Sequence, residues 1–369
     1  MGKTRFIALL SAAALVGAAF WACSSTEYVY LDEKEPVTVL NAQLNTMDKT
    51  HCILLSESAS HSIKALQGAR ITVTVNEGDP VIAREETPEE YSSYTQFCGV
   101  YVFDAEFRPG DSVRIEAEAA GMKVRSEVSV PGPIEIVSID TASVLRTEYD
   151  DMGSSLAEAS LLVKARVKDP DGGRNYYRVR RLIEEYYPDG YYHYSFNPET
   201  FKMDRLFEEG PLTESGYSTF DCSEEPLISG IAAAGSSSDG ETVDIGALFE
   251  ADNTWSVFDD TSFDGTTGEY VLRLYIPYWN QYQSLTACTR SEYLVINSLS
   301  FDEYHFLKAL DASDFATFIS EPVSMPSNVE GGLGMVSVES VSVARIFSLE
   351  VEVVDEEDYY DFPSWWDID

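Results

Sequence analysis

The chain of 369 residues is poor in positive charge, with 25 Lys and Arg against 63 Asp and Glu and a formal net charge of −38. Such a surplus of negative charge repels phosphate backbones, so nucleic acid is excluded as a bulk partner. Histidine is also scarce, and the four histidines form no His-Glu-x-x-His spacing that would place two imidazoles around zinc. They are His51, His61, His193 and His305.

Several other motifs of enzymes are missing. No two cysteines are spaced as Cys-x-x-Cys, and no Gly-x-Ser-x-Gly elbow of a serine hydrolase occurs. The glycine-rich segment Glu330-Gly-Gly-Leu-Gly334 lacks the lysine of a phosphate loop and indicates a turn. Carboxylates are so numerous that no pair is singled out as general acid and base. We therefore predict no catalytic residue, no metal site and no cofactor.

The beginning of the chain is typical of an exported lipoprotein. Lys3 and Arg5 precede an uncharged, mainly apolar stretch over residues 6–22, and Cys23 follows at once. The stretch is short for a membrane span and polar residues follow it, so it predicts a signal peptide over residues 1–22. We expect acylation of Cys23 and an anchor in the outer membrane, facing the cell surface or the periplasm. An ordinary signal peptide cut near Ala22 is the alternative.

Four cysteines remain after Cys23, and four cysteines allow three disulfide pairings. Pairing Cys52 with Cys98 and Cys222 with Cys288 would keep each bridge within one predicted domain. Free buried thiols are the alternative.

An immunoglobulin-like or transthyretin-like sandwich is predicted over residues 37–132, after a lipidated linker over residues 23–36. Apolar and polar residues alternate along residues 113–119 and again along 122–130, as in strands with one buried face. Gly121 between them suits a tight hairpin turn. Pro131-Gly-Pro133 interrupts the ladder, and we place the domain boundary there.

A second, larger antiparallel β domain is predicted over residues 134–354. Its strands include residues 161–168, 269–276, 292–299 and 336–354. Ser300-Phe-Asp-Glu303 is a capping box, and it predicts one short helix that covers an apolar face of the sheet. The chain is therefore predicted to be mainly all-β.

Two aromatic segments are candidate interaction surfaces. Pro188-Asp-Gly190 is predicted to turn the chain between two aromatic strands, where the tyrosines cannot all face the core. The acidic tail over residues 355–369 carries Trp365 and Trp366, which suit either a mobile tail or a docking peptide. The candidate surface residues of the strands are Tyr186, Tyr187, Tyr191, Tyr192 and Tyr194.

Five segments give the chain a family resemblance. They are Leu55-Ser-Glu-Ser58, residues 66–73, residues 258–265, residues 302–310 and, most specific of all, residues 321–334. With the signal and Cys23, they resemble the exported lipoproteins of Bacteroidota grouped as a domain of unknown function, DUF4249. The resemblance covers most of the mature chain, but not the acidic tail.

The resemblance implies a β-rich lipoprotein, often encoded beside a TonB-dependent receptor, and brings no catalytic residues with it. We expect a non-enzymatic binding or accessory subunit that helps such a receptor capture a nutrient of unknown identity. A surface hydrolase acting on glycans or peptides is one alternative, which a deep cleft with two buried carboxylates of opposed pKa would favour. A structural or adhesive surface protein is the other.

Overall fold

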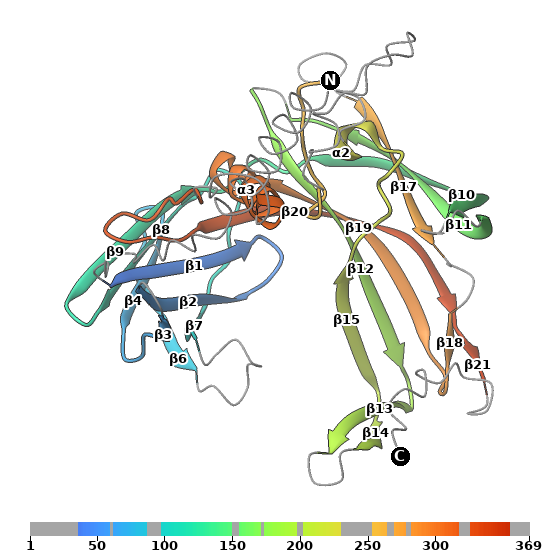
Figure 1. Cartoon of the computed structure of the whole chain (residues 1–369), viewed down its shortest axis with the longest axis horizontal. Helices are drawn as coiled ribbons and strands as arrows, with labels where there is room; N and C mark the ends of the chain where they lie inside the picture. The colour runs from blue at the N-terminus through green and yellow to red at the C-terminus, as the bar shows by residue number, and fades with distance from the viewer. Residues whose placement is uncertain are drawn as a thin grey trace, which may run out of the picture.

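The structure, a computed structural model, describes residues 36–59, 62–86, 97–149, 155–170, 173–197, 202–229, 253–263, 269–277, 282–316 and 325–354. Strands dominate it (Figure 1), which confirms the predicted all-β class. The helices of the described part are α2 (Pro226–Ser229) and α3 (Phe301–Ala316).

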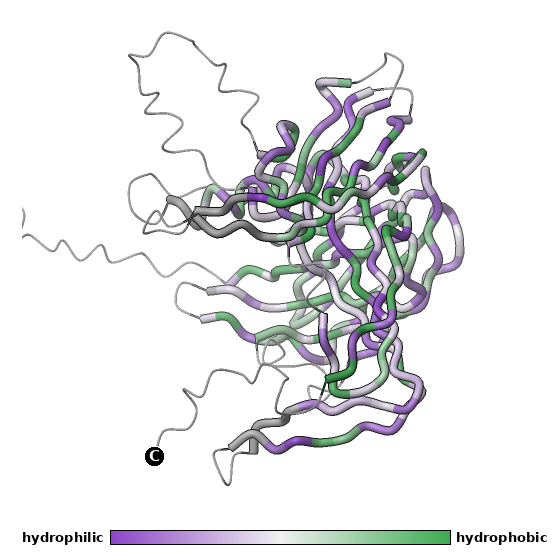
Figure 2. The backbone as a smooth tube through the Cα atoms, turned by 90° about the vertical axis from the view of Figure 1, so that its right-hand side faces the viewer, coloured by the Kyte–Doolittle hydropathy of each residue, from purple (hydrophilic) through white to green (hydrophobic). Residues whose placement is uncertain are grey.

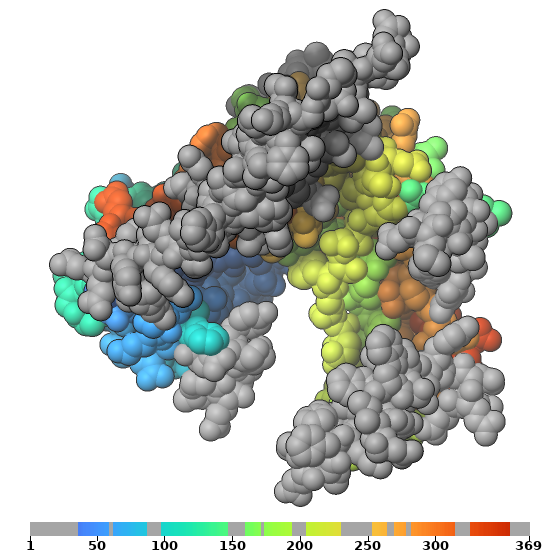
Figure 3. Space-filling view, viewed as in Figure 1, coloured from blue at the N-terminus to red at the C-terminus, as the bar shows by residue number. Residues whose placement is uncertain are grey.

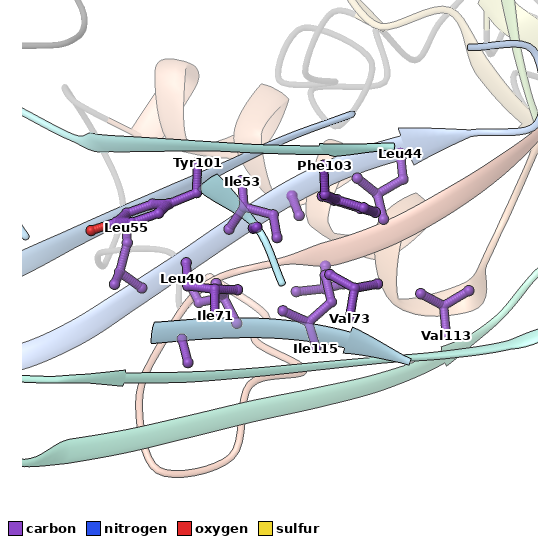
Figure 4. Packing of buried hydrophobic residues seen from close by; sticks show 14 of the residues in the cluster. Leu40, Leu44, Ile53, Leu55, Ile71, Val73, Tyr101, Phe103, Val113 and Ile115 are labelled. Atoms are coloured by element: carbon purple, nitrogen blue, oxygen red, sulfur yellow. The ribbon is translucent and has the colours of Figure 1, made fainter. Parts of the chain in front are cut away.

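Two layers of strands form the first sandwich. In one layer, hydrogen-bonded neighbours follow the order β6 (Arg84–Glu86), β7 (Gly99–Asp104), β2 (Thr50–Ala59) and β1 (Val37–Asn45), with β3 (Ser62–Ala65) also on β2. The other layer has the order β5 (Val81–Ile82), β4 (Arg70–Val75), β8 (Ser112–Ala119) and β9 (Met122–Ser129). Figure 4 shows the apolar side chains of both layers meeting between them.

The hairpin of β8 and β9 confirms the alternation seen in the sequence. Along β8, Val113 and Ile115 are buried and Arg114 between them is exposed. Ala120 and Gly121 both have positive φ, 51° and 82°, so they form the two-residue turn that matches the twist of the strands.

The second sandwich is again built from two layers. One is the three-stranded sheet of β10 (Glu135–Tyr149), β11 (Ser155–Lys168) and β17 (Glu269–Pro277). The other contains β15 (Leu212–Ser218), β12 (Tyr176–Tyr187), β19 (Thr289–Leu299), β20 (Val336–Glu350) and the short β16 (Val257–Asp259). Val163 of β11, Leu274 of β17 and Ile296 of β19 are fully buried in the core between them.

Three short elements complete the described part. β13 (Gly190–Asn197) pairs with β14 (Lys202–Glu209), and β18 (Gln283–Ser284) pairs with β21 (Glu352–Val353). Helix α3 begins at the predicted cap, where the Glu303 amide donates to Ser300 Oγ at 3.2 Å. Leu307 of α3 is buried against Tyr176 and Leu299, so the helix covers apolar side chains at one end of the sheet.

Strand β20 belongs to both sandwiches. Its first residues pair in parallel with β1, from Ala42 opposite Val336 to Asn45 opposite Glu339. From Ser340 onward it pairs antiparallel with β19 instead. One sheet of ten strands therefore runs through both halves of the molecule.

The linker between the halves is attached to the same strand. Ser340 Oγ donates to the carbonyl oxygen of Pro131 at 2.6 Å, and Ser342 Oγ donates to that of Ile134 at 2.5 Å. The chain thus crosses from β9 to β10 along the middle of β20.

The glycine-rich segment before β20 closes the first sandwich. Its Leu333 carbonyl accepts from the Leu40 amide of β1 at 2.9 Å, and its Glu330 exchanges two backbone hydrogen bonds with Arg125 of β9. Gly334 has φ +125°, and a Cβ there would lie 2.0 Å from the carbonyl oxygen of Leu40. Only glycine permits this approach of the two backbones.

We predict that Gly334→Ala destabilises the protein by about 3 kcal/mol, because a left-handed backbone and a backbone clash coincide there. Gly68→Ala is the matched control, since Gly68 has φ +68° and a Cβ there would meet no atom within 4 Å. We expect about 1 kcal/mol for it. Urea unfolding measures both values, and equal losses would contradict the role of the clash.

Candidate functional site

An arm made of β12, β13, β14 and β15 carries the predicted tyrosines (Figure 1). Only its end, formed by β13 and β14, is two-stranded, because β12 also pairs with β19 as far as Tyr186. β12 pairs with β15 as far as Tyr187 opposite Leu212, and pairing resumes between β13 and β14 with Gly190 opposite Glu209. The prediction of a hairpin turn at Pro188-Asp-Gly190 is therefore wrong, because β12 and β13 do not pair with each other. They follow one another along the same side of the arm, with β14 and β15 on the other side.

Two glycines allow this arm to bend. A Cβ on Gly190 would lie 2.1 Å from the carbonyl oxygen of Glu208, and one on Gly210 would lie 2.5 Å from the amide nitrogen of Gly190. The backbones of the two sides thus touch where the ladder is interrupted. The sequence Asp-Gly suggested a hairpin turn, but here the missing side chain of glycine lets two backbones lie close together.

The predicted tyrosines differ in exposure. Tyr186 and Tyr192 are 46% and 40% exposed, whereas Tyr187 is buried and stacks on Tyr191 with 4.9 Å between ring centroids. Tyr194 also belongs to β13. Trp365, Trp366 and Cys23 lie outside the described residues.

The end of the arm, formed by β13 and β14, exposes further apolar side chains that the sequence analysis missed. Phe207 lies opposite Tyr192 with 4.8 Å between ring centroids, and Leu206 is its neighbour on β14. Phe207 and Leu206 are 46% and 45% exposed. Figure 2 shows hydrophobic and hydrophilic stretches side by side on this ribbon, at the bottom of the view. A two-stranded ribbon is marginally stable alone, so a partner surface that covers these side chains would stabilise it.

All four cysteines of the described part are free, so neither predicted disulfide is formed. The register of β2 and β7 places Gly99, the residue after Cys98, opposite Leu55, three residues along β2 from Cys52. At about 3.3 Å per residue, this offset exceeds the ~7 Å limit between the Cα atoms of a disulfide.

The other two cysteines lie in different clusters. Cys222 packs against the core of the second sandwich, and Cys288 packs against Tyr187 and Val351. Burial raises the pKa of the Cys222 thiol to about 12, so this thiol stays protonated at neutral pH.

A pair of buried carboxyl groups lies where the two sandwiches meet. Glu303 of α3 and Glu339 of β20 are each 2% exposed. Gln43 Nε2 of β1 donates to both of them, at 3.0 Å to Glu303 and 2.9 Å to Glu339. Elements from both sandwiches thus share one polar cluster.

Two more side chains, from β12 and β19, hold Glu339. Arg180 Nη2 lies 3.3 Å from Glu339 Oε2, and the Asn297 amide donates to the same oxygen. Burial and the neighbouring Glu339 raise the pKa of Glu303 well above its ordinary value. In the predicted capping box, the Glu303 carboxylate would accept a hydrogen bond from the Ser300 amide, but in the structure it accepts one from Gln43 instead.

An accessible hollow in the described part of the chain lies elsewhere. It has a volume of ≈ 510 Å³ and is lined by residues of β4, β8 and β9 together with Glu330 and Gly331. Arg125 Nε lies 2.7 Å from Glu330 Oε2 and lowers the pKa of Glu330. An acid held in its ionised form suits charge pairing rather than proton donation.

Metal-binding clusters and membrane-spanning helices are both missing from the described residues. These residues contain no group of three or more His, Cys, Asp or Glu side chains placed to hold a metal ion. None of the described helices combines the length and the apolar composition of a membrane span.

The family of the chain follows from a match that spans this whole architecture. The family model of a domain of unknown function, DUF4249, matches residues 26–345, which cover both sandwiches and α3. The chain belongs to the DUF4249 family. This confirms the resemblance to the DUF4249 family seen in the sequence.

Other comparisons add little to the DUF4249 assignment. No curated protein matches the chain. Among solved structures, a "Biofilm associated protein - BSP domain" aligns at 6% identity and a TM-score of 0.12, over 85% of this chain and 59% of that one. At that score the alignment carries no information about fold or function.

We predict that Glu303→Gln stabilises the protein increasingly as pH rises. The folded state holds the Glu303 proton more tightly than the unfolded state does. Protonated Glu303 therefore contributes its full stabilisation at pH values below the pKa of this carboxyl group in the unfolded chain. This stabilisation is lost as pH rises through the folded pKa, by up to about 1.4 kcal/mol per pH unit. Gln cannot ionise and keeps the neutral form at every pH, beside Glu339, Arg178 and Arg180.

Urea unfolding of wild type and variant across the acid to neutral range measures this difference. Glu116→Gln, on the exposed face of β8, is the control for the loss of one negative charge. A constant difference between wild type and Glu303→Gln at every pH would contradict the assignment.

Proposed function

We propose that this protein is a non-enzymatic binding or accessory lipoprotein of the outer membrane that helps a TonB-dependent transporter capture a nutrient. The observation that carries the proposal is the arm, whose end exposes Tyr192, Leu206 and Phe207 on a ribbon of only two strands. Exposed aromatic side chains on a rigid scaffold are typical anchors of protein interfaces.

The expected lipid anchor near the N-terminus supports the same proposal. The signal and Cys23 would tether the protein to the outer membrane, where transporters lie. An acylated cysteine would keep the arm near membrane proteins at all times, which lowers the affinity that docking needs.

The alternative of a hydrolase has less support from the described residues. The Glu303 and Glu339 carboxyl groups are both buried among polar partners, so a glycan or peptide chain has no path to them in this conformation. The hollow on β4, β8 and β9 instead holds carboxylates next to basic side chains. Neither place combines access with a proton donor.

We predict that Cys23→Ser releases the protein from the membrane, because acyl chains cannot attach to serine. Fractionation of cells followed by mass spectrometry of the first mature peptide checks this. Wild type should sediment with the outer membrane and carry acyl chains on Cys23. An unacylated, freely soluble wild type would contradict the anchor.

We predict that the double variant Tyr192→Ala with Phe207→Ala no longer co-purifies with an outer-membrane barrel protein in mild detergent. The free energy of unfolding should change by less than about 1 kcal/mol. The stability change is small because both side chains are half exposed.

The matched control is Ile63→Ala with Ile82→Ala in the first sandwich, where the two side chains are 57% and 64% exposed. It should leave recovery of the barrel unchanged. Recovery of the protein alone from wild-type cells would overturn the accessory role.

A further inference from the structure

One side of the arm is an unpaired strand edge, interrupted between β14 and β15 by Gly210 and Pro211. β15 is the last strand of the ten-stranded sheet, and β14 is one of the two strands of its ribbon. Each pairs on one side, β15 with β12 and β14 with β13. No described strand pairs with the opposite side of either, so among the described residues an edge of eight and then seven residues has no strand partner.

Such an edge presents free backbone N–H and C=O groups to its surroundings. Natural proteins cover or shorten long edges because they invite pairing with other chains. Here five successive residues of β15, from Thr213 to Tyr217, are exposed, and a Cβ on Gly216 would meet no atom within 4 Å. In Figure 3 the yellow-green β15 borders an open hollow between it and the blue first sandwich. As far as the described residues go, the edge of β15 is therefore accessible to another strand.

Acidic residues outnumber basic ones along this edge, since β14 and β15 contain four acids and two bases, Lys202 and Arg205. Glu208, Glu209 and Glu214 lie on β14 and β15, and no cation in the described part of the chain forms an ion pair with them. Arg205 of β14 lies over the ring of Tyr192, 3.8 Å from its centroid. A partner strand with basic side chains would complement these carboxylates.

We propose that an extended, basic segment of a partner protein adds to β14 and β15 as a further strand. This inference deepens the proposed function, on which it rests, by stating the chemistry of the segment that the arm receives. Backbone hydrogen bonds along the edge supply affinity, and the carboxylates select lysine and arginine at alternate positions.

Two other occupants are disfavoured by charge. The chain's own tail after Val354 contains acids and no base, so it would meet the edge with like charges. A second copy of the protein pairing edge to edge would place the same glutamates opposite one another. Both would be visible as protection of the edge in the free protein.

The test uses hydrogen exchange of the purified full-length protein with a peptide of about ten alternating lysine and threonine residues, at low salt (about 0.05 M). The peptide should slow exchange of the β14 and β15 amides. The same peptide N-methylated at alternate residues keeps its charge and side chains but loses hydrogen-bond donors, and should bind at least tenfold more weakly.

Glu208→Lys with Glu214→Lys should weaken binding of the unmodified peptide at least tenfold. Glu77→Lys with Glu116→Lys, in the first sandwich, is the matched charge control and should leave the affinity within about twofold. Equal binding of both peptides, or binding without slowed exchange at β14 and β15, would overturn the proposal. So would an edge already protected in the free protein.

The two hypotheses fail separately. A barrel that is recovered through Tyr192 and Phe207 while the edge stays unprotected would leave the accessory role standing and overturn strand addition. Protection of the edge by the peptide, without any barrel recovered from cells, would overturn the accessory role alone.

Discussion

The division of β20 between two partners is the constraint on which the rest of the structure depends. Because its first residues extend the sheet of β1 and its later residues extend that of β19, both sandwiches share one backbone ladder. A strand cannot rotate at its middle without breaking the hydrogen bonds on either side of that point. The arm, which continues from β12 beside β19, is therefore held in a fixed relation to the first sandwich.

The polar cluster of Glu303, Glu339 and Gln43 lies at the point where β20 changes partner. Removing carboxyl groups from water is costly, and hydrogen bonds from Gln43 and Asn297 offset part of that cost. Buried polar groups accept only partners in the correct position, whereas apolar contacts tolerate sliding. We interpret the cluster as a means of fixing how α3 and the two sandwiches meet.

Local features were predictable from the sequence, and long-range ones were not. The β8 and β9 hairpin follows from alternation and the turn at Gly121, and the start of α3 follows from Ser300. Residues 188–190 looked like a hairpin turn, yet the strand ladder continues past them, because pairing of β12 with β19 and β15 determines its direction. Which distant strands pair depends on contacts that no local pattern encodes. The candidate site was also only partly predictable. The density of tyrosines identified the arm, whereas Leu206 and Phe207 became candidates only once the strand register placed them opposite residues of β13.

We propose that the end of the arm contacts a transporter in the outer membrane. Photo-crosslinking in living cells, with a crosslinking amino acid in place of Tyr192, tests it most directly. We expect an adduct with an outer-membrane barrel protein from this position and none from Ile82 of the first sandwich, which is more exposed than Tyr192. Absence of the adduct from position 192, or equal adducts from both positions, would contradict it.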